Sequence, residues 1–168
     1  LSPGNLCVPS GATEALAAAI LATVEPGDEV IVFTPAYDAY APLIRRAGGL
    51  PVEVALQPPG WRIERAALEA AMSSRIRAIV FNNPHNPTGR LFDREELAVV
   101  AEVAVVNDLI VISDEVWEHI VLDPPPPWDV ARSDGGGADL GDPPLSSLRA
   151  ATSPQEGGLF SPVASLSG

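Results

Sequence analysis

Short apolar runs and longer helix-forming segments alternate along the first 123 residues. The apolar runs are rich in β-branched residues and are bounded by Pro, Gly, Asn or Asp, a pattern that predicts buried strands. We expect these strands at residues 29–34, 50–56, 77–82 and 109–113. Each run is apolar almost throughout, which predicts a strand covered on both faces.

The segments around these runs have the composition of helices. The first, 15–24, consists mostly of Ala and Leu, which are strong helix formers, and Ser10 is placed to cap it. We expect the remaining helices at 37–47, closed by Gly48 and Gly49, at 64–72 and at 93–106. Alternating helices and strands predict an α/β fold, a mostly parallel sheet with helices on both faces.

The composition changes abruptly after Asp123. Of the 45 residues at 124–168, eight are Pro and seven are Gly. That third of the segment exceeds the roughly 25–30% above which low-complexity disorder is expected. We therefore divide the chain into an α/β unit at 1–123 and a Pro/Gly-rich tail at 124–168, which we expect to be disordered.

The chain is strongly acidic, with a formal charge of −12. This charge argues against nucleic acid and anionic membranes as partners, because both require a basic face. The most apolar segment, 15–24, is about half of the ~20 residues that span a bilayer. The single cysteine, Cys7, cannot form an internal disulfide, and nothing suggests a metal site. We expect a cytoplasmic protein.

The segment after the third strand, Phe81 to Gly89, is the first candidate for a ligand site. Two prolines and a glycine within six residues fix the backbone of this loop. Asn86, between His85 and Pro87, is expected to be held toward a ligand at the carboxyl end of the strand, where open α/β sheets bind ligands. The alternative is an ordinary rigid turn.

Two further positions have ligand-binding chemistry. The helix that follows Gly11 has a free amino end that could bind an anion, although capping alone explains many such starts. Asp114 follows the fourth strand, and a buried carboxylate is costly unless a cation meets it. Asp114 could instead cap the next segment. We assign no catalytic role to His85 or His119.

Five short motifs occur in an order that is highly specific as a set. They are Ser-Gly-Ala-Thr-Glu-Ala at 10–15, Pro-Gly-Asp-Glu-Val at 26–30, Pro-Ala-Tyr-Asp-Ala-Tyr at 35–40, Asn-Asn-Pro-His-Asn-Pro-Thr-Gly at 82–89 and Ser-Asp-Glu-Val-Trp at 113–117. With them the chain resembles the pyridoxal-phosphate-dependent aminotransferases of fold type I, class I/II. The resemblance implies that residues 1–123 are the central part of a large cofactor domain.

The resemblance also implies a set of cofactor-binding residues. They are Gly11, Ala12, Thr13, Tyr37, Asn86, Asp114 and Trp117. The helix start would hold the phosphate, Tyr37 would stack on the pyridine ring, Asn86 would donate to the phenolic oxygen and Asp114 would pair with the pyridine nitrogen. Trp117 replaces the usual tyrosine, so it can donate a hydrogen bond but cannot accept one.

The chain lacks the family's Schiff-base lysine, since all ten basic residues are arginine. We therefore assign no catalytic residue, and expect this chain to be inactive alone although its family transfers amino groups from amino acids to 2-oxo acids as homodimers. A truncated or frameshifted aminotransferase would produce this pattern. The alternative is a noncatalytic binding or dimerisation module. A Rossmann nucleotide binder is less well supported, because no Gly-x-Gly-x-x-Gly follows a strand.

Overall fold

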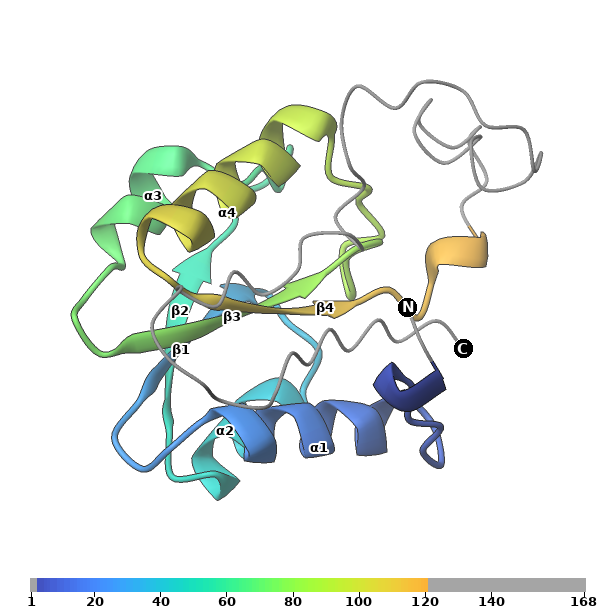
Figure 1. The fold of residues 1–168 in the computed structure, drawn as a ribbon. Coiled ribbons are helices and arrows are strands. Elements are labelled where there is room, and N and C mark those ends of the chain that lie inside the picture. The colour runs from blue at the N-terminus through green and yellow to red at the C-terminus, as the bar shows by residue number, and fades with distance from the viewer. Residues whose placement is uncertain (1–2, 121–168) are drawn as a thin grey trace.

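A computed structural model describes residues 3–120 (Figure 1). In this part of the chain the strands are β1 (Glu29–Thr34), β2 (Leu50–Ala55), β3 (Ile76–Asn82) and β4 (Ile110–Asp114). The α-helices are α1 (Ala12–Thr23), α2 (Tyr40–Arg46), α3 (Arg65–Ala70) and α4 (Arg94–Val106). Short 3-10 helices lie at Pro3–Asn5 and Glu118–Ile120. The predicted alternation of helix and strand is confirmed.

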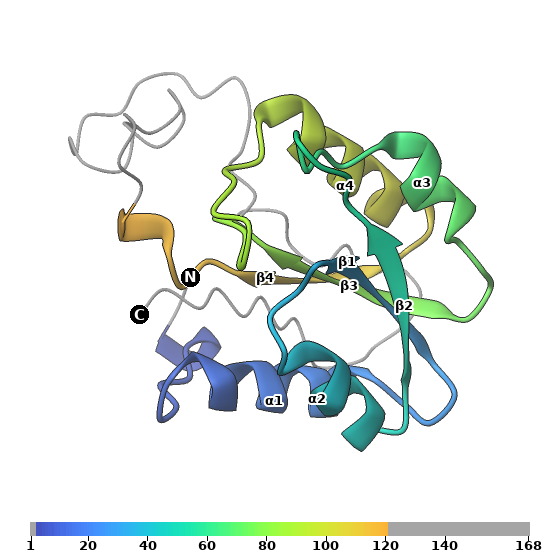
Figure 2. The same ribbon diagram turned by 180° about the vertical axis from the view of Figure 1, so that it is seen from behind.

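The four strands form one parallel sheet in the order β2-β1-β3-β4. Ile31 of β1 pairs with Val52 of β2 on one side and with Ile79 of β3 on the other. Helices α1 and α2 cover one face, and α3 and α4 cover the opposite face (Figures 1 and 2). The predicted parallel sheet with helices on both faces is therefore correct.

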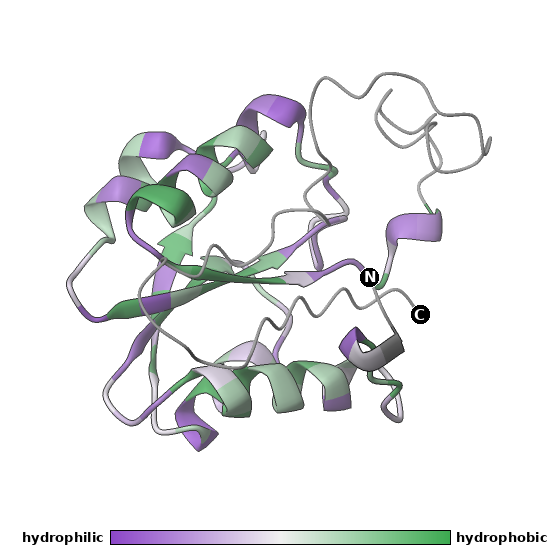
Figure 3. Ribbon diagram, viewed as in Figure 1, coloured by the Kyte–Doolittle hydropathy of each residue, from purple (hydrophilic) through white to green (hydrophobic). Residues whose placement is uncertain are grey.

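Successive residues of β3 belong alternately to two separate hydrophobic cores. Ile79 and Phe81 pack in the core beneath α3 and α4, whereas Ala78 and Val80 pack in the core beneath α1 and α2. All four side chains are almost fully buried. The sheet is accordingly hydrophobic over most of its length in Figure 3, which explains why the strands appear in the sequence as continuous apolar runs.

The beginnings of two helices differ from expectation. Ser10 does not cap α1: the cap position is Gly11, with φ 96°, and the N–H of Ser10 donates to the Glu14 carboxylate instead. Helix α2 begins at Tyr40 rather than at Tyr37. The Tyr37 carbonyl accepts the N–H of Tyr40 in a turn that precedes the helix.

The end of α2 is closed by the predicted pair of glycines. Gly48 has φ 87° and donates its N–H to the Arg45 carbonyl, while the N–H of Gly49 bonds to the Ile44 carbonyl. This is the Schellman arrangement, which requires a left-handed residue directly after the helix. The backbone then passes very close to α1 and to the turn before β1, and enters β2.

We expect Gly49→Ala to lower the free energy of unfolding by about 1–3 kcal/mol, measured by urea denaturation. An added Cβ would lie 2.7 Å from Cγ1 of Val24 and 3.2 Å from the Asp28 carbonyl oxygen. Gly60→Ala is the matched control, since its nearest neighbour would be Arg62 Cγ at an ordinary 3.5 Å. Equal stability of the two variants would contradict the close packing at Gly49.

Candidate functional site

The connections that leave β1 and β3 run in opposite directions across the sheet. The chain goes from β1 to its neighbour β2 on one side, and from β3 to its neighbour β4 on the other. Between two such strands the loops separate at their carboxyl ends, and open α/β sheets bind ligands in the crevice that results. Tyr37 lies on the loop after β1 and Asn86 on the loop after β3. Both predicted residues therefore lie at this switch point.

Asp114, the last residue of β4, is a buried carboxylate at the same edge, with only 3% of its surface exposed. Its Oδ2 accepts a hydrogen bond of 2.7 Å from the Tyr40 hydroxyl, and its Oδ1 accepts the N–H of Val116 at 3.2 Å. Both donors are neutral. Within residues 3–120, no arginine or histidine forms an ion pair with Asp114, so the cation expected from the sequence is not supplied by this part of the chain.

Tyr40 is a site residue that sequence reasoning missed. It is 2% exposed at the first position of α2, and its partner Asp114 lies 74 positions away along the chain. Burial, and then the hydrogen bond to Asp114, raises the pKa of Tyr40 far above its ordinary value. Tyr40 therefore stays protonated and donates to Asp114. One signal in the sequence could have revealed it. A tyrosine that is buried usually has a hydrogen-bond partner for its hydroxyl, so a buried Tyr40 implies such a partner.

The start of α1 lies at this edge too. Helix α1 precedes β1 and runs antiparallel to it, so its first residue lies beside the carboxyl ends of the strands, and the helix packs against β4 (Figure 1). Among residues 3–120, no side chain caps it at Gly11, and no atom lies within 4 Å of the position that a Cβ of Gly11 would occupy. The N–H groups of the first turn, including those of Ala12 and Thr13, have no partners within the helix.

The two predicted aromatic residues differ in their surroundings. The ring of Tyr37 is partly buried and packs edge-on against the ring of Tyr40, with centroids 5.6 Å apart. Trp117 lies in the turn after β4, and 43% of its surface is exposed. Among the described residues, Trp117 makes no contact with another aromatic ring. Contacts thus join Tyr37, Tyr40 and Asp114, whereas Trp117 shares only the edge of the sheet with them.

His85 is buried beneath the loop after β3 and fixes the conformation of that loop. Its side chain is buried, its Nδ1 lies 2.8 Å from the Thr88 hydroxyl, and its ring packs against Phe92 at 5.4 Å. Its backbone N–H donates to the Arg90 carbonyl at 2.8 Å. Within residues 3–120, the side-chain amide of Asn86 makes no hydrogen bond. The loop is therefore fixed while the amide of Asn86 remains available.

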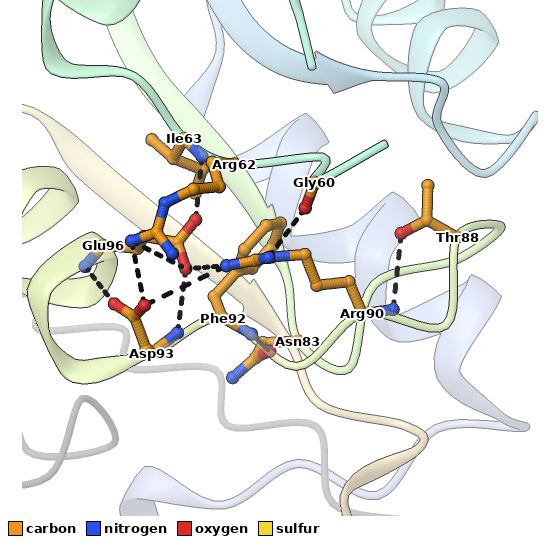
Figure 4. A network of polar contacts seen from close by, with 9 residues as sticks. All are labelled: Gly60, Arg62, Ile63, Asn83, Thr88, Arg90, Phe92, Asp93 and Glu96. Atoms are coloured by element: carbon orange, nitrogen blue, oxygen red, sulfur yellow. Dashed lines mark hydrogen bonds and ion pairs between the residues drawn. The ribbon is translucent and has the colours of Figure 1, made fainter. Parts of the chain in front are cut away.

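A buried ion pair fixes the far end of the same loop (Figure 4). Glu96 is 2% exposed, and its carboxylate accepts the N–H groups of Ile63 and Asp93, at 2.9 and 3.0 Å, and the guanidinium of Arg90. Arg90 also donates to the Gly60 carbonyl at 2.7 Å. The network joins the loop to α4 and to the segment before α3. The capping-box pattern of Asp93 and Glu96 is the signal in the sequence that could have revealed it.

The part of the chain that the structure describes contains neither a membrane-spanning helix nor a cluster of metal ligands. None of its helices is long and apolar enough to cross a bilayer. No group of three or more His, Cys, Asp or Glu side chains there is placed to hold a metal ion.

Comparison with known proteins identifies relatives for most of this chain. The family model for aminotransferase class I and II matches residues 1–141. A probable N-succinyldiaminopimelate aminotransferase of Mycobacterium tuberculosis is 48% identical over 121 residues, and the methionine aminotransferase of Escherichia coli is 45% identical over 116 residues. These alignments cover 71% and 69% of this chain, but the chain spans only 30% of the length of either relative.

Solved structures give the same result. The N-succinyldiaminopimelate aminotransferase of M. tuberculosis superposes with a TM-score of 0.66 at 50% identity, over 67% of this chain and 30% of that one. The aspartate aminotransferase of Thermus thermophilus with maleate superposes with a TM-score of 0.71 at 36% identity, over 74% of this chain and 33% of that one. The sheet and helices described above are thus shared with these enzymes.

We expect Glu96→Gln to lower the free energy of unfolding by about 3 kcal/mol, because it removes the buried counter-charge of the largely buried Arg90 and leaves only the half-exposed Asp93 carboxylate, at 4.0 Å. Glu95→Gln, at the exposed neighbouring position, should cost less than about 1 kcal/mol. Urea denaturation at pH 7.5 measures both. Similar losses in the two variants would show that the buried pair contributes no particular stability.

We expect the stability of the protein to fall as the pH decreases below about 6.5, the ordinary pKa of histidine. Burial lowers the pKa of His85, and the backbone hydrogen bond with Phe33 opposes this shift only in part. Between pH ~6.5 and the lower pKa of His85 in the folded protein, the unfolded chain therefore binds a proton that the folded chain does not. Stability is lost across this range of pH. The difference in the free energy of unfolding between pH 7.5 and 5.5 should shrink in His85→Gln.

His119→Gln is the control for this measurement, since 75% of the His119 side chain is exposed. It should keep the pH dependence of the unsubstituted protein. If the two substitutions changed the pH dependence equally, burial of His85 would not be its source.

Proposed function

The chain belongs to the class I and II aminotransferases, and from this premise we propose that residues 3–120 form the part of a pyridoxal-phosphate-dependent aminotransferase that holds the cofactor. The observation that carries the proposal is Asp114, a buried carboxylate with only neutral donors among the described residues, beside the switch point of the sheet. Such a group is suited to a cationic ligand atom, which would compensate its buried charge.

The residues at this edge match the chemical groups of the cofactor. Asp114 would accept a hydrogen bond from a protonated pyridine nitrogen, and its negative charge would favour that protonated form. The free amide of Asn86 would donate to the phenolic oxygen, and the ring of Tyr37 offers a face for stacking. The start of α1, from Gly11 to Thr13, would hold the phosphate through its N–H groups. We place Trp117 at the rim of this site.

Tyr40 would support Asp114 in this role. Its hydroxyl occupies Oδ2 at 2.7 Å and is neutral, so it orients the carboxylate without compensating its charge. The remaining lone pairs of Asp114 are left for a ligand. When bound, pyridoxal phosphate supplies an electron sink that stabilises negative charge on the substrate carbon. The protein's part is to keep the pyridine nitrogen protonated for that purpose.

We propose the transfer of an amino group from an amino acid to a 2-oxo acid as the activity of the full-length protein. The family's reaction needs an amine that bonds to the cofactor and moves a proton. No lysine occurs in these 168 residues, and arginine is neither a nucleophile nor a base near neutral pH. This chain would thus contribute cofactor binding, and it should not transfer amino groups by itself.

We expect the purified chain to bind pyridoxal phosphate noncovalently, and Asp114→Asn to weaken that binding about 10- to 100-fold through loss of a charged hydrogen bond. Equilibrium dialysis with absorbance detection of the cofactor measures the Kd. Asp108→Asn is the control: Asp108 is an exposed residue with φ 53°, a conformation that Asn adopts readily. Its Kd should not change. Absence of binding, or equal weakening by both substitutions, would contradict the proposal.

A further inference from the structure

Asn82, the last residue of β3, connects two groups of the proposed site through one side chain. The residue is buried, with 4% of its surface exposed. Its Oδ1 accepts the backbone N–H of Asn86 at 2.6 Å, and its Nδ2 donates to the backbone carbonyl of Asp114 at 2.9 Å. A single planar amide thus contacts the loop after β3 on one side and the end of β4 on the other.

The position of this amide follows from the pairing of the strands. Asn82 lies opposite Asp114 in the parallel register of β3 and β4. The N–H of the next residue, Asn83, donates to the Asp114 carbonyl at 3.0 Å, so that carbonyl accepts two hydrogen bonds from the end of β3. The Asn82 side chain therefore extends the contact between the strands to Asn86, four residues farther along the chain.

Few side chains can make both of these contacts. One end must accept a hydrogen bond from an N–H, and the other end must donate to a carbonyl. An ionised aspartate has no donor to offer, and alanine or serine is too short to reach both partners. Because the asparagine amide is rigid, the distance between its two contacts is fixed.

We infer that Asn82 is a positioning residue that sets the backbone of Asn86 relative to Asp114. It would thereby fix the separation of the two groups that face the phenolic oxygen and the pyridine nitrogen. This inference rests on the proposed function, because those contacts are assigned there. Asn82 itself touches neither cofactor atom; it acts through its two partners.

Asn83 supplies a matched control. It is the adjacent asparagine, and its side-chain Oδ1 also accepts one backbone N–H, that of Phe92, at 3.0 Å. Its side chain contacts neither Asn86 nor Asp114 among the described residues. Loss of a comparable hydrogen bond can therefore be separated from loss of the link across the site.

The first measurement is a double-mutant cycle on the full chain with pyridoxal phosphate as the probe. We expect Asn82→Ala to weaken binding about tenfold or more, and Asn86→Ala to have little additional effect in that background. In the Asn83→Ala background, Asn86→Ala should keep its full effect. Additive losses from Asn82→Ala and Asn86→Ala, or equal weakening by Asn82→Ala and Asn83→Ala, would overturn the inference.

The second measurement needs no cofactor. Amide hydrogen exchange at Asn86, followed by NMR, should be at least about tenfold faster in Asn82→Ala than in Asn83→Ala, because only the former loses the acceptor for that N–H. Asn82→Asp keeps the acceptor, so it should preserve the protection of the Asn86 amide. If Asn82→Ala does not fold, Asn82→Asp is the variant to measure, and loss of protection in it would contradict the inference. Unchanged exchange in a folded Asn82→Ala would overturn the inference.

The two measurements separate the inference from the function on which it rests. If the unsubstituted chain did not bind pyridoxal phosphate, the proposed function would fail. The exchange measurement would then still decide whether Asn82 holds Asn86. If the chain binds the cofactor but the cycle is additive, only the positioning role is wrong.

Discussion

The pairing of β3 along both of its edges determines where the rest of the site lies. A strand buried on both faces cannot leave its backbone N–H and C=O groups without partners, so β3 must have neighbours on both sides. These neighbours are β1 and β4, and all three strands are parallel. Their carboxyl ends consequently meet at one edge, which brings Tyr37, Asn86 and Asp114 together from three separate segments of the chain.

Two buried carboxylates illustrate how differently the fold treats negative charge. Glu96 is compensated by the Arg90 guanidinium and by two backbone N–H groups, and it joins the loop to α4. Asp114 has a phenol and one backbone N–H, both neutral. The first arrangement is complete within the described chain and serves structure. The second leaves charge that the proposed ligand would compensate.

The sequence was a good guide to elements that depend on local composition. Apolar runs predicted the four strands. In β1 and β3 burial on both faces leaves no polar alternation, whereas β2, at the edge of the sheet, is mostly exposed or half-buried. The pair Gly48 and Gly49 predicted the end of α2, since a left-handed residue strongly favours glycine. Ser10 was wrongly expected to cap α1, because its N–H bonds to Glu14 and the chain enters the helix through Gly11. The Pro/Gly-rich tail at 124–168 lies outside the described residues.

The residues of the proposed site could be named from the sequence only where they belong to a short motif. Asn86 and Asp114 stand in short patterns that can be recognised from the chain alone. Tyr40, Asn82 and Glu96 were missed because their roles depend on partners brought near by the sheet, 74, 32 and 33 positions away in their longest contacts. Hydrophobic periodicity indicates that such a side chain is buried. It does not indicate which polar group the side chain meets.

The hydrogen bond between Tyr40 and Asp114 closes a loop of 74 residues, so neither partner is in place until α2, β3 and β4 have assembled. A site with this dependence has no counterpart in the unfolded chain. Any ligand that occupies it therefore binds the native state alone and adds its binding free energy to the folding equilibrium, about 2.7 kcal/mol at a concentration 100 times its Kd.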